Sequence, residues 1–189
     1  RDCSAWSRCR RPGAHDPAPD PARARARERA RASAPSKPAH GLACYSRGMD
    51  EQTHLAQTHP WLAERIARVL LAWRAKAADG EVIKIVESVR SLATQQAYFS
   101  KGASRADGIN LLSLHQFSPA LACDAACLRG GKYIQGASDP AWERWAACAE
   151  AEGLEAGKRW AKLVDCPHVQ VSEADRVRLV QAAVGATPD

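Results

Sequence analysis

An abrupt change in composition near Met49 limits which part of this 189-residue chain can fold around a core. Six of the 11 prolines and 11 of the 27 Lys and Arg residues precede it, in the stretch RRPGAHDPAPDPARARARERARASAPSKPAH and its flanks. A segment of this composition buries too little apolar surface to offset the entropy lost on ordering. We therefore predict a disordered Arg/Ala/Pro-rich tail over residues 1–48 and one folded domain over residues 49–189.

The positive charge of the chain lies in this predicted tail. Residues 1–48 hold 11 basic and 4 acidic residues, a net charge of +7, whereas the whole chain carries +6. The remaining 16 basic and 17 acidic residues leave the predicted domain at −1, so we expect it not to bind nucleic acid. Two interpretations of the tail stay open: the natural product begins at Met49, or the tail is a real basic arm that binds nucleic acid or an acidic surface.

Cysteine usage and hydropathy indicate the class of protein. The seven cysteines are odd in number and show no regular framework, so we expect mostly reduced, buried thiols. The longest strongly apolar run, residues 69–73, is too short to cross a bilayer. No secretory signal is evident at the start of the chain. We expect a soluble monomer that is made in the cytoplasm and does not contact membranes.

The hydrophobic pattern after Met49 predicts alternating helices and short strands. A first helix should run from Pro60 towards Gly80 and bury the apolar stripe Leu62, Ile66, Val69, Leu70 and Trp73. Strands are predicted for EVIKIVES, ALACDAA and PHVQV, and further helices for SLATQQAYFSKG, SDPAWERWAACAEAEG and SEADRVRLVQAAVG. Because the order lacks βαβ regularity, we predict an α+β fold, a short antiparallel sheet flanked by helices.

Two stretches carry residues suited to hydrolysis. SLHQFSPALACD contains His115 and Asp124, and LVDCPHVQV contains Asp165 and His168. A zinc hydrolase needs three protein ligands, commonly imidazole nitrogens and carboxylate oxygens, and a carboxylate to accept a proton from water. His115, Asp124 and His168 can supply the ligands, and Asp165 the base. No His-Glu-x-x-His sequence is present, which excludes the thermolysin-like class.

A third stretch, ESVRSLATQQAYFSKGAS, places Arg90 at the end of a predicted strand and Gln95 in the next helix. A guanidinium group near a metal stabilises the oxyanion that develops when water attacks an amide carbonyl. Its planar fork can also bind a substrate carboxylate. Both roles are open to Arg90.

Together these stretches resemble three ordered blocks of one family. The matching positions are Arg90, Ser91 and Gln95, then Ser113, His115 and Asp124, then Asp165 and His168, preceded by Gly157 and Trp160. The family is that of the zinc D-alanyl-D-alanine carboxypeptidases and L-alanyl-D-glutamate endopeptidases, the VanY-like group that includes many phage endolysins. The resemblance covers residues 60–172.

The resemblance implies a compact zinc peptidase with one Zn²⁺ per chain, which cleaves peptidoglycan stem peptides next to a D-residue. It implies that His115, Asp124 and His168 are the metal ligands, Asp165 the base and Arg90 an electrophilic helper. Gln95 and Ser113 are the expected substrate-binding residues. It further implies a phage or prophage endolysin, made without a signal peptide and acting in the periplasm or cell wall after release.

The second block departs from the family pattern Ser-x-His-x-x-Gly-x-Ala-x-Asp. Ser118 stands in place of the glycine, and Ala122 occupies the position of the usual aspartate. We expect the two extra residues before Asp124 to enlarge the preceding turn, and the even shift to preserve the facing of the strand. If the insertion turned Asp124 away, the alternative would be a non-catalytic peptidoglycan-binding relative on the same scaffold.

Other chemistry-bearing residues have simpler interpretations. Cysteines flank the predicted ligands, but without paired C-x₂₋₄-C units a structural Cys/His zinc site is disfavoured. His54 and His59 precede the first predicted helix and are expected to be solvated. The tryptophans that could stack on a sugar are expected to pack in the core instead: Trp142, Trp145 and Trp160.

Overall fold

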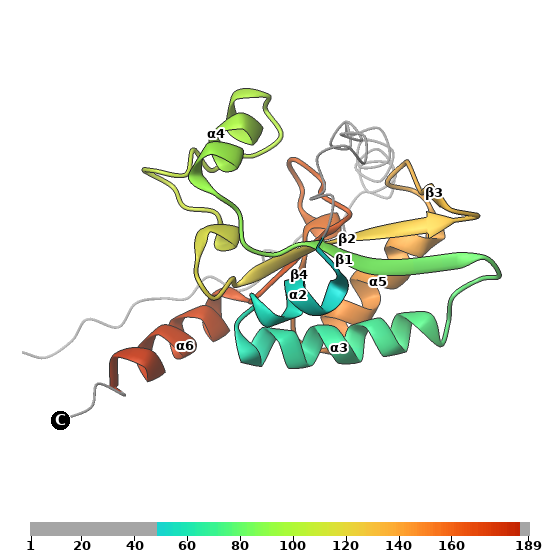
Figure 1. The fold of residues 1–189 in the computed structure, drawn as a ribbon, viewed down its shortest axis with the longest axis horizontal. Coiled ribbons are helices and arrows are strands. Elements are labelled where there is room, and N and C mark those ends of the chain that lie inside the picture. The colour runs from blue at the N-terminus through green and yellow to red at the C-terminus, as the bar shows by residue number, and fades with distance from the viewer. Residues whose placement is uncertain (1–48, 186–189) are drawn as a thin grey trace, which may run out of the picture.

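The structure is a computed structural model, and it describes residues 49–185 (Figure 1). The predicted tail over residues 1–48 lies outside the described residues. The helices are α2 (Glu51–Ala56), α3 (Pro60–Arg74), α4 (Leu92–Ser100), η2 (Leu114–Gln116), α5 (Pro140–Ala151), η3 (Gly157–Arg159) and α6 (Glu173–Gly185). The strands are β1 (Glu81–Glu87), β2 (Ala122–Arg129), β3 (Lys132–Tyr133), β4 (Glu155–Ala156) and β5 (His168–Gln170).

The strands of the described region form one antiparallel sheet in the order β1-β2-β5-β4, with β3 paired to the end of β2. The α+β prediction is confirmed. The central strand β2 pairs with β1 along one edge, where Ile83 opposes Cys127, and with β5 along the other, where Asp124 opposes His168. Helices α2, α3 and α5 lie on one side of the sheet, and α4 projects from the other side (Figure 1). The hydrophobic core therefore lies mainly between the sheet and helices α3 and α5.

Helix α3 supplies much of that core. Pro60 begins the helix, since its fixed φ suits the first turn, and a His59 ring nitrogen accepts a hydrogen bond from the Trp61 amide at 3.2 Å. The predicted apolar stripe is confirmed, because each of its members is at most 2% exposed: Leu62, Ile66, Val69, Leu70 and Trp73. The helix ends at Arg74, earlier than the predicted stop at Gly80.

The short helix α2 precedes this element and was not predicted. Asp50 caps it by accepting a hydrogen bond from the Thr53 amide at 2.7 Å. The helix contacts β1, and it carries His54 into the interior, where the side chain is only 2% exposed. The expectation that His54 is solvated is therefore wrong. Its Nδ1 lies 3.3 Å from the hydroxyl of Ser88, directly after β1.

Helix α5 contributes two buried tryptophans whose indole N–H groups are both satisfied. Trp142 donates to the Ile134 carbonyl at 3.2 Å, and Trp145 donates to the Pro167 carbonyl at 3.0 Å. The second bond ties α5 to the residue directly before His168. The prediction that these two tryptophans pack in the core is confirmed.

The described cysteines behave as small apolar residues. All of them are buried free thiols: Cys123, Cys127, Cys148 and Cys166. For these four, the expectation of reduced, buried thiols is confirmed. Burial raises the pKa of the Cys166 thiol to about 11, which keeps it protonated at neutral pH. Among the described residues, no helix combines the length and apolar character needed to cross a membrane.

Candidate metal centre and active site

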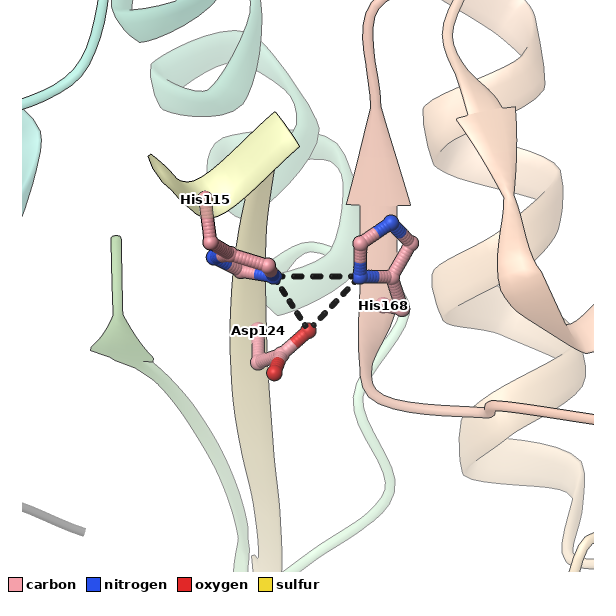
Figure 2. A group of neighbouring side chains, drawn as sticks. All are labelled: His115, Asp124 and His168. Carbon is pink, nitrogen blue, oxygen red and sulfur yellow. Dashed lines mark hydrogen bonds and ion pairs between the residues drawn. The ribbon is translucent and has the colours of Figure 1, made fainter. Parts of the chain in front are cut away.

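Three side chains from three separate elements converge at one end of β2 (Figure 2). His115 comes from η2, Asp124 from β2 and His168 from β5. The distance from His115 Nε2 to His168 Nδ1 is 3.2 Å, and Asp124 Oδ1 lies 3.4 Å and 3.0 Å from these two nitrogens respectively. All three residues are buried. The structure thus brings together the three predicted metal ligands.

The nitrogen of each imidazole that faces away from this centre has a hydrogen-bond acceptor. His115 Nδ1 lies 2.7 Å from the carbonyl oxygen of Ser88, and His168 Nε2 lies 2.9 Å from Oε1 of Gln170. The Gln170 amide is oriented because its Nε2 donates to the Glu155 carboxylate at 2.8 Å. In neutral histidines the outer nitrogens are therefore the donors, and the inner nitrogens present lone pairs.

This donor set fits a zinc ion. Two nitrogen lone pairs and a carboxylate oxygen point at one another in a buried position, an arrangement that is repulsive without a cation between them. Zinc–ligand bonds of about 2.0–2.1 Å give a tetrahedron with edges of about 3.3 Å. The observed separations of 3.0–3.4 Å match these edges. Hydrogen bonding of the outer imidazole nitrogens is also typical of metal-ligating histidines.

The second carboxylate oxygen of Asp124 is bound by Arg90, whose Nη2 donates to Oδ2 at 3.1 Å. Arg90 also donates through Nε to Glu87 at 2.9 Å, and its Nη2 forms a further ion pair with the same carboxylate. Burial raises the pKa of Asp124, whereas His115 and His168, when protonated in the metal-free protein, hold it well below its usual range. Burial likewise opposes the charge of Arg90, but Glu87 and Asp124 raise its pKa. Asp124 is therefore held ionised and in one orientation.

The two-residue insertion before Asp124 is absorbed ahead of the strand. The Ala120 amide donates to the Gln57 carbonyl, and the Ala120 carbonyl accepts from the His59 amide, both at 2.9 Å. These bonds attach the turn to the segment between α2 and α3. Asp124 then enters β2 in register with His168 and faces the two histidines. The insertion does not turn Asp124 away from them.

A cavity of about 810 Å³ opens beside these residues. Its lining includes Arg90, Ser113, His115, Asp165 and His168. It draws the rest of its wall from residues 103–115 and 160–176. The cavity joins the candidate metal ligands to the candidate base Asp165 and is large enough for a peptide segment.

Asp165 is held in a turn that depends on Gly157. The Asp165 amide donates to the Gly157 carbonyl at 3.1 Å, and the Asp165 carbonyl accepts from the His168 amide at 3.2 Å. A Cβ atom at position 157 would lie 2.6 Å from the Asp165 carbonyl oxygen and 3.0 Å from the Cβ of His168. The glycine therefore permits the close approach that seats both Asp165 and His168.

Trp160 also lines the cavity, which corrects the expectation that it packs in the core. Its ring is half-buried and lies 5.0 Å from the His168 ring, measured between centroids. Trp160 directly follows η3 and is not part of α5, the helix that carries the two core tryptophans. Trp160 therefore forms part of the cavity wall next to the candidate ligand His168, a contact between separate elements that a local sequence pattern does not reveal.

The two predicted substrate-binding residues occupy different environments. Ser113 lines the cavity and caps η2, and its side chain accepts from the His115 amide. Gln95 is fully buried, and its amide accepts from Arg90 at 3.0 Å and donates to the Ala106 carbonyl at 2.6 Å. These contacts give Gln95 a part in holding Arg90. Substrate binding by either residue stays a prediction.

The sequence prediction did not include three groups that support the site. Glu87 holds Arg90, Gln170 holds His168, and the backbone carbonyl of Ser88 holds His115. Gln170 could have been noticed because it stands two residues after His168 in a strand, where alternate side chains share a face. The role of the Ser88 carbonyl leaves no signal in the sequence, because every residue has that group.

Comparison with known proteins finds a similar fold among solved structures. No family model and no curated protein matches the chain. Among solved structures, it is similar to the crystal structure of Serratia marcescens L-Ala D-Glu endopeptidase ChiX, with a TM-score of 0.51 and 21% sequence identity. The match covers 72% of this chain and 98% of that chain. The chain therefore has the fold of this endopeptidase, as the sequence resemblance predicted.

Proposed function

We propose that this protein is a zinc-dependent peptidase that hydrolyses peptide bonds in the stem peptides of bacterial peptidoglycan. The observation that carries the proposal is the convergence of His115, Asp124 and His168, with each imidazole bound on its outer side. The cavity beside them and the shared fold with an L-Ala D-Glu endopeptidase support the substrate class.

His115, Asp124 and His168 would hold one zinc ion per chain. When bound, zinc supplies Lewis acidity, which lowers the pKa of water and polarises the carbonyl group of the bond to be cleaved. The carboxylate of Asp165, in the same cavity, accepts the proton of the attacking water and returns it to the leaving amine. Arg90 keeps Asp124 ionised and oriented, and its place in the cavity lining is compatible with a contact to the developing oxyanion.

The biological setting is part of the same proposal. A peptidase of this kind would act as a monomer on the peptidoglycan of the periplasm or cell wall. Release from the cell as a phage or prophage endolysin is the setting that the sequence resemblance implies.

The proposal is tested by counting metal and by following cleavage. The purified full chain should contain one zinc per molecule by mass spectrometry and should release new amino termini from purified peptidoglycan. Asp165→Asn should keep the zinc and lose about 10²–10⁴-fold in rate, the usual contribution of a general base. His168→Ala should lose the zinc as well as the activity.

Each other outcome has a distinct meaning. Stoichiometric zinc without cleavage would indicate the non-catalytic peptidoglycan-binding relative. A wild-type chain that binds no zinc would refute the assignment of His115, Asp124 and His168. Full activity in Asp165→Asn would remove Asp165 from the role of base.

A further inference from the structure

Two cationic side chains of the cavity wall have no anionic partner among the described residues. Arg105 and Lys162 both line the cavity and are exposed, and neither forms an ion pair or hydrogen bond within residues 49–185. The other cations of the lining are occupied: Arg90 by two carboxylates and Arg176 by Glu173. Two positive charges therefore remain available to a ligand in the cavity.

The backbone that carries Arg105 is fixed on both sides, although its side chain is exposed. The Ala103 amide donates to the Tyr98 carbonyl at 2.9 Å, and the Ala106 carbonyl accepts from the Gln95 amide at 2.6 Å. Gln95 in turn accepts from Arg90. The position of Arg105 is thus coupled to the residues that orient the candidate metal ligand Asp124.

Lys162 lies in the other segment of the cavity lining, residues 160–176, in the turn that leads to Asp165. The next residue, Leu163, has a φ of +57°, a left-handed conformation that a leucine rarely adopts. Such a conformation persists only where the surrounding contacts impose it, and it is enriched at binding and catalytic sites. Leu163 and Asp165 line the same cavity. The backbone of this turn therefore places Lys162 in the same stretch of the cavity lining as the candidate base Asp165.

We propose that Arg105 and Lys162 form a subsite for a free carboxylate of the peptide substrate. The inference rests on the proposed function and names its substrate class more narrowly. A glutamyl residue joined to its neighbour through one carboxyl group keeps the other one free. An anion there would meet the planar fork of Arg105 and the point charge of Lys162, which come from two separate segments of the cavity lining. The subsite should select free-acid peptides over peptides in which that carboxylate is amidated.

The test compares two synthetic stem peptides that differ only in this group, one with a free carboxylate and one with a carboxamide. Dissociation constants are measured by calorimetry at low salt on the zinc-loaded full chain, with Asp165→Asn added to every protein so that the peptides are not cleaved. In parallel, kcat/KM is measured on the same proteins without that substitution. The wild type should bind the acid more tightly than the amide. Arg105→Gln or Lys162→Gln should each reduce this preference about threefold, and the double variant about tenfold, with amide binding unchanged.

Lys101→Gln is the matched control, because Lys101 is an exposed cation of the same loop that does not line the cavity. It should leave the preference unchanged. Arg105→Glu should invert the preference if the side chain contacts the carboxylate. Equal wild-type binding of acid and amide, or equal weakening of both by the glutamine variants, would overturn the subsite while cleavage itself still stood. Selective binding of the acid without any cleavage would support the subsite and refute the proposed peptidase.

Discussion

Arg90 binds the oxygen of Asp124 that faces away from the two histidines. Its Nη2 lies 3.1 Å from Asp124 Oδ2, whereas Oδ1 faces His115 and His168. The two side chains are 3% and 6% exposed, so water screens this ion pair little. A single carboxylate is thus shared between a permanent protein cation and the candidate metal position.

Arg90→Met should destabilise the fold strongly, because it leaves the buried carboxylate of Asp124 and the half-buried carboxylate of Glu87 without their cation. Loss of one partner from a buried pair costs about 3–5 kcal/mol. Urea unfolding of the metal-free proteins would measure this loss. Arg68→Met is the control, since Arg68 forms its ion pairs at the surface and should change the free energy of unfolding by less than about 1 kcal/mol. Equal stability of the two variants would contradict the buried role of Arg90.

Gln170→Leu should weaken zinc binding about 10- to 100-fold, the usual effect of removing a hydrogen bond from a metal-ligating histidine. The reason is that Gln170 keeps the proton of His168 on Nε2 and leaves Nδ1 for the metal. Competition with a chromogenic chelator measures the affinity. Glu155→Gln still offers an oxygen acceptor to Gln170 and should bind zinc almost as the wild type does. Wild-type affinity in Gln170→Leu would refute this positioning role.

Gly157→Ala should destabilise the protein by about 1–3 kcal/mol, the usual cost of overpacking. The added methyl group would lie 2.6 Å from the Asp165 carbonyl oxygen, which must move together with its turn. Unfolding in urea should report the destabilisation, and the rate of peptide cleavage should fall as well because Asp165 is displaced. A variant with unchanged stability and rate would show that the turn can relax without cost.

The buried His54 should make the free energy of unfolding smaller in mild acid than at neutral pH. Burial lowers the pKa of its imidazole, although the nearby carboxylates oppose this shift. The unfolded chain therefore takes up a proton near pH 6.5 that the folded chain accepts only at lower pH. The free energy of unfolding should fall as the pH drops below 6.5, until the lower folded-state pKa is reached.

His54→Gln removes this titration and keeps a polar side chain near Ser88. Its loss of stability between pH 7.5 and 5.5, measured by urea unfolding, should be smaller than that of the wild type. Histidines common to both proteins contribute equally, so the difference isolates His54. Identical pH dependence of the two proteins would mean that His54 becomes protonated in the folded state as easily as in the unfolded chain.

Local patterns were sufficient to predict the main elements and to select three candidate ligands that lie together in the structure. The spacing of the apolar residues in α3 matches one buried helix face, and Pro60 marks where that helix begins. His115, Asp124 and His168 could be selected because zinc chemistry restricts ligands to few residue types, and the resemblance gave their order. The facing of Asp124 followed from the period of a strand, which an even insertion preserves.

Features that depend on tertiary contacts could not be predicted in this way. Helix α2 has six residues, too few for a periodic pattern that would predict it. The burial of His54 depends on its contact with Ser88, which is 34 residues away in the sequence. In the sequence, Trp160 has the features of an ordinary core residue. Its position beside the His168 ring arises only when η3 and β5 pack together. The ion pair between Arg90 and Glu87 depends on how the chain turns at the end of β1.

Helix α2 bears on how far the chain can be shortened. The resemblance to the peptidase family begins at residue 60, so a fragment starting there would retain every candidate ligand and the base. It would nevertheless lose the Gln57 carbonyl that holds the turn before β2 and the His54 ring that packs on Ser88. Since Ser88 and that turn position His115 and Asp124, the smallest fragment that folds with the candidate site intact should begin no later than the cap of α2, Asp50.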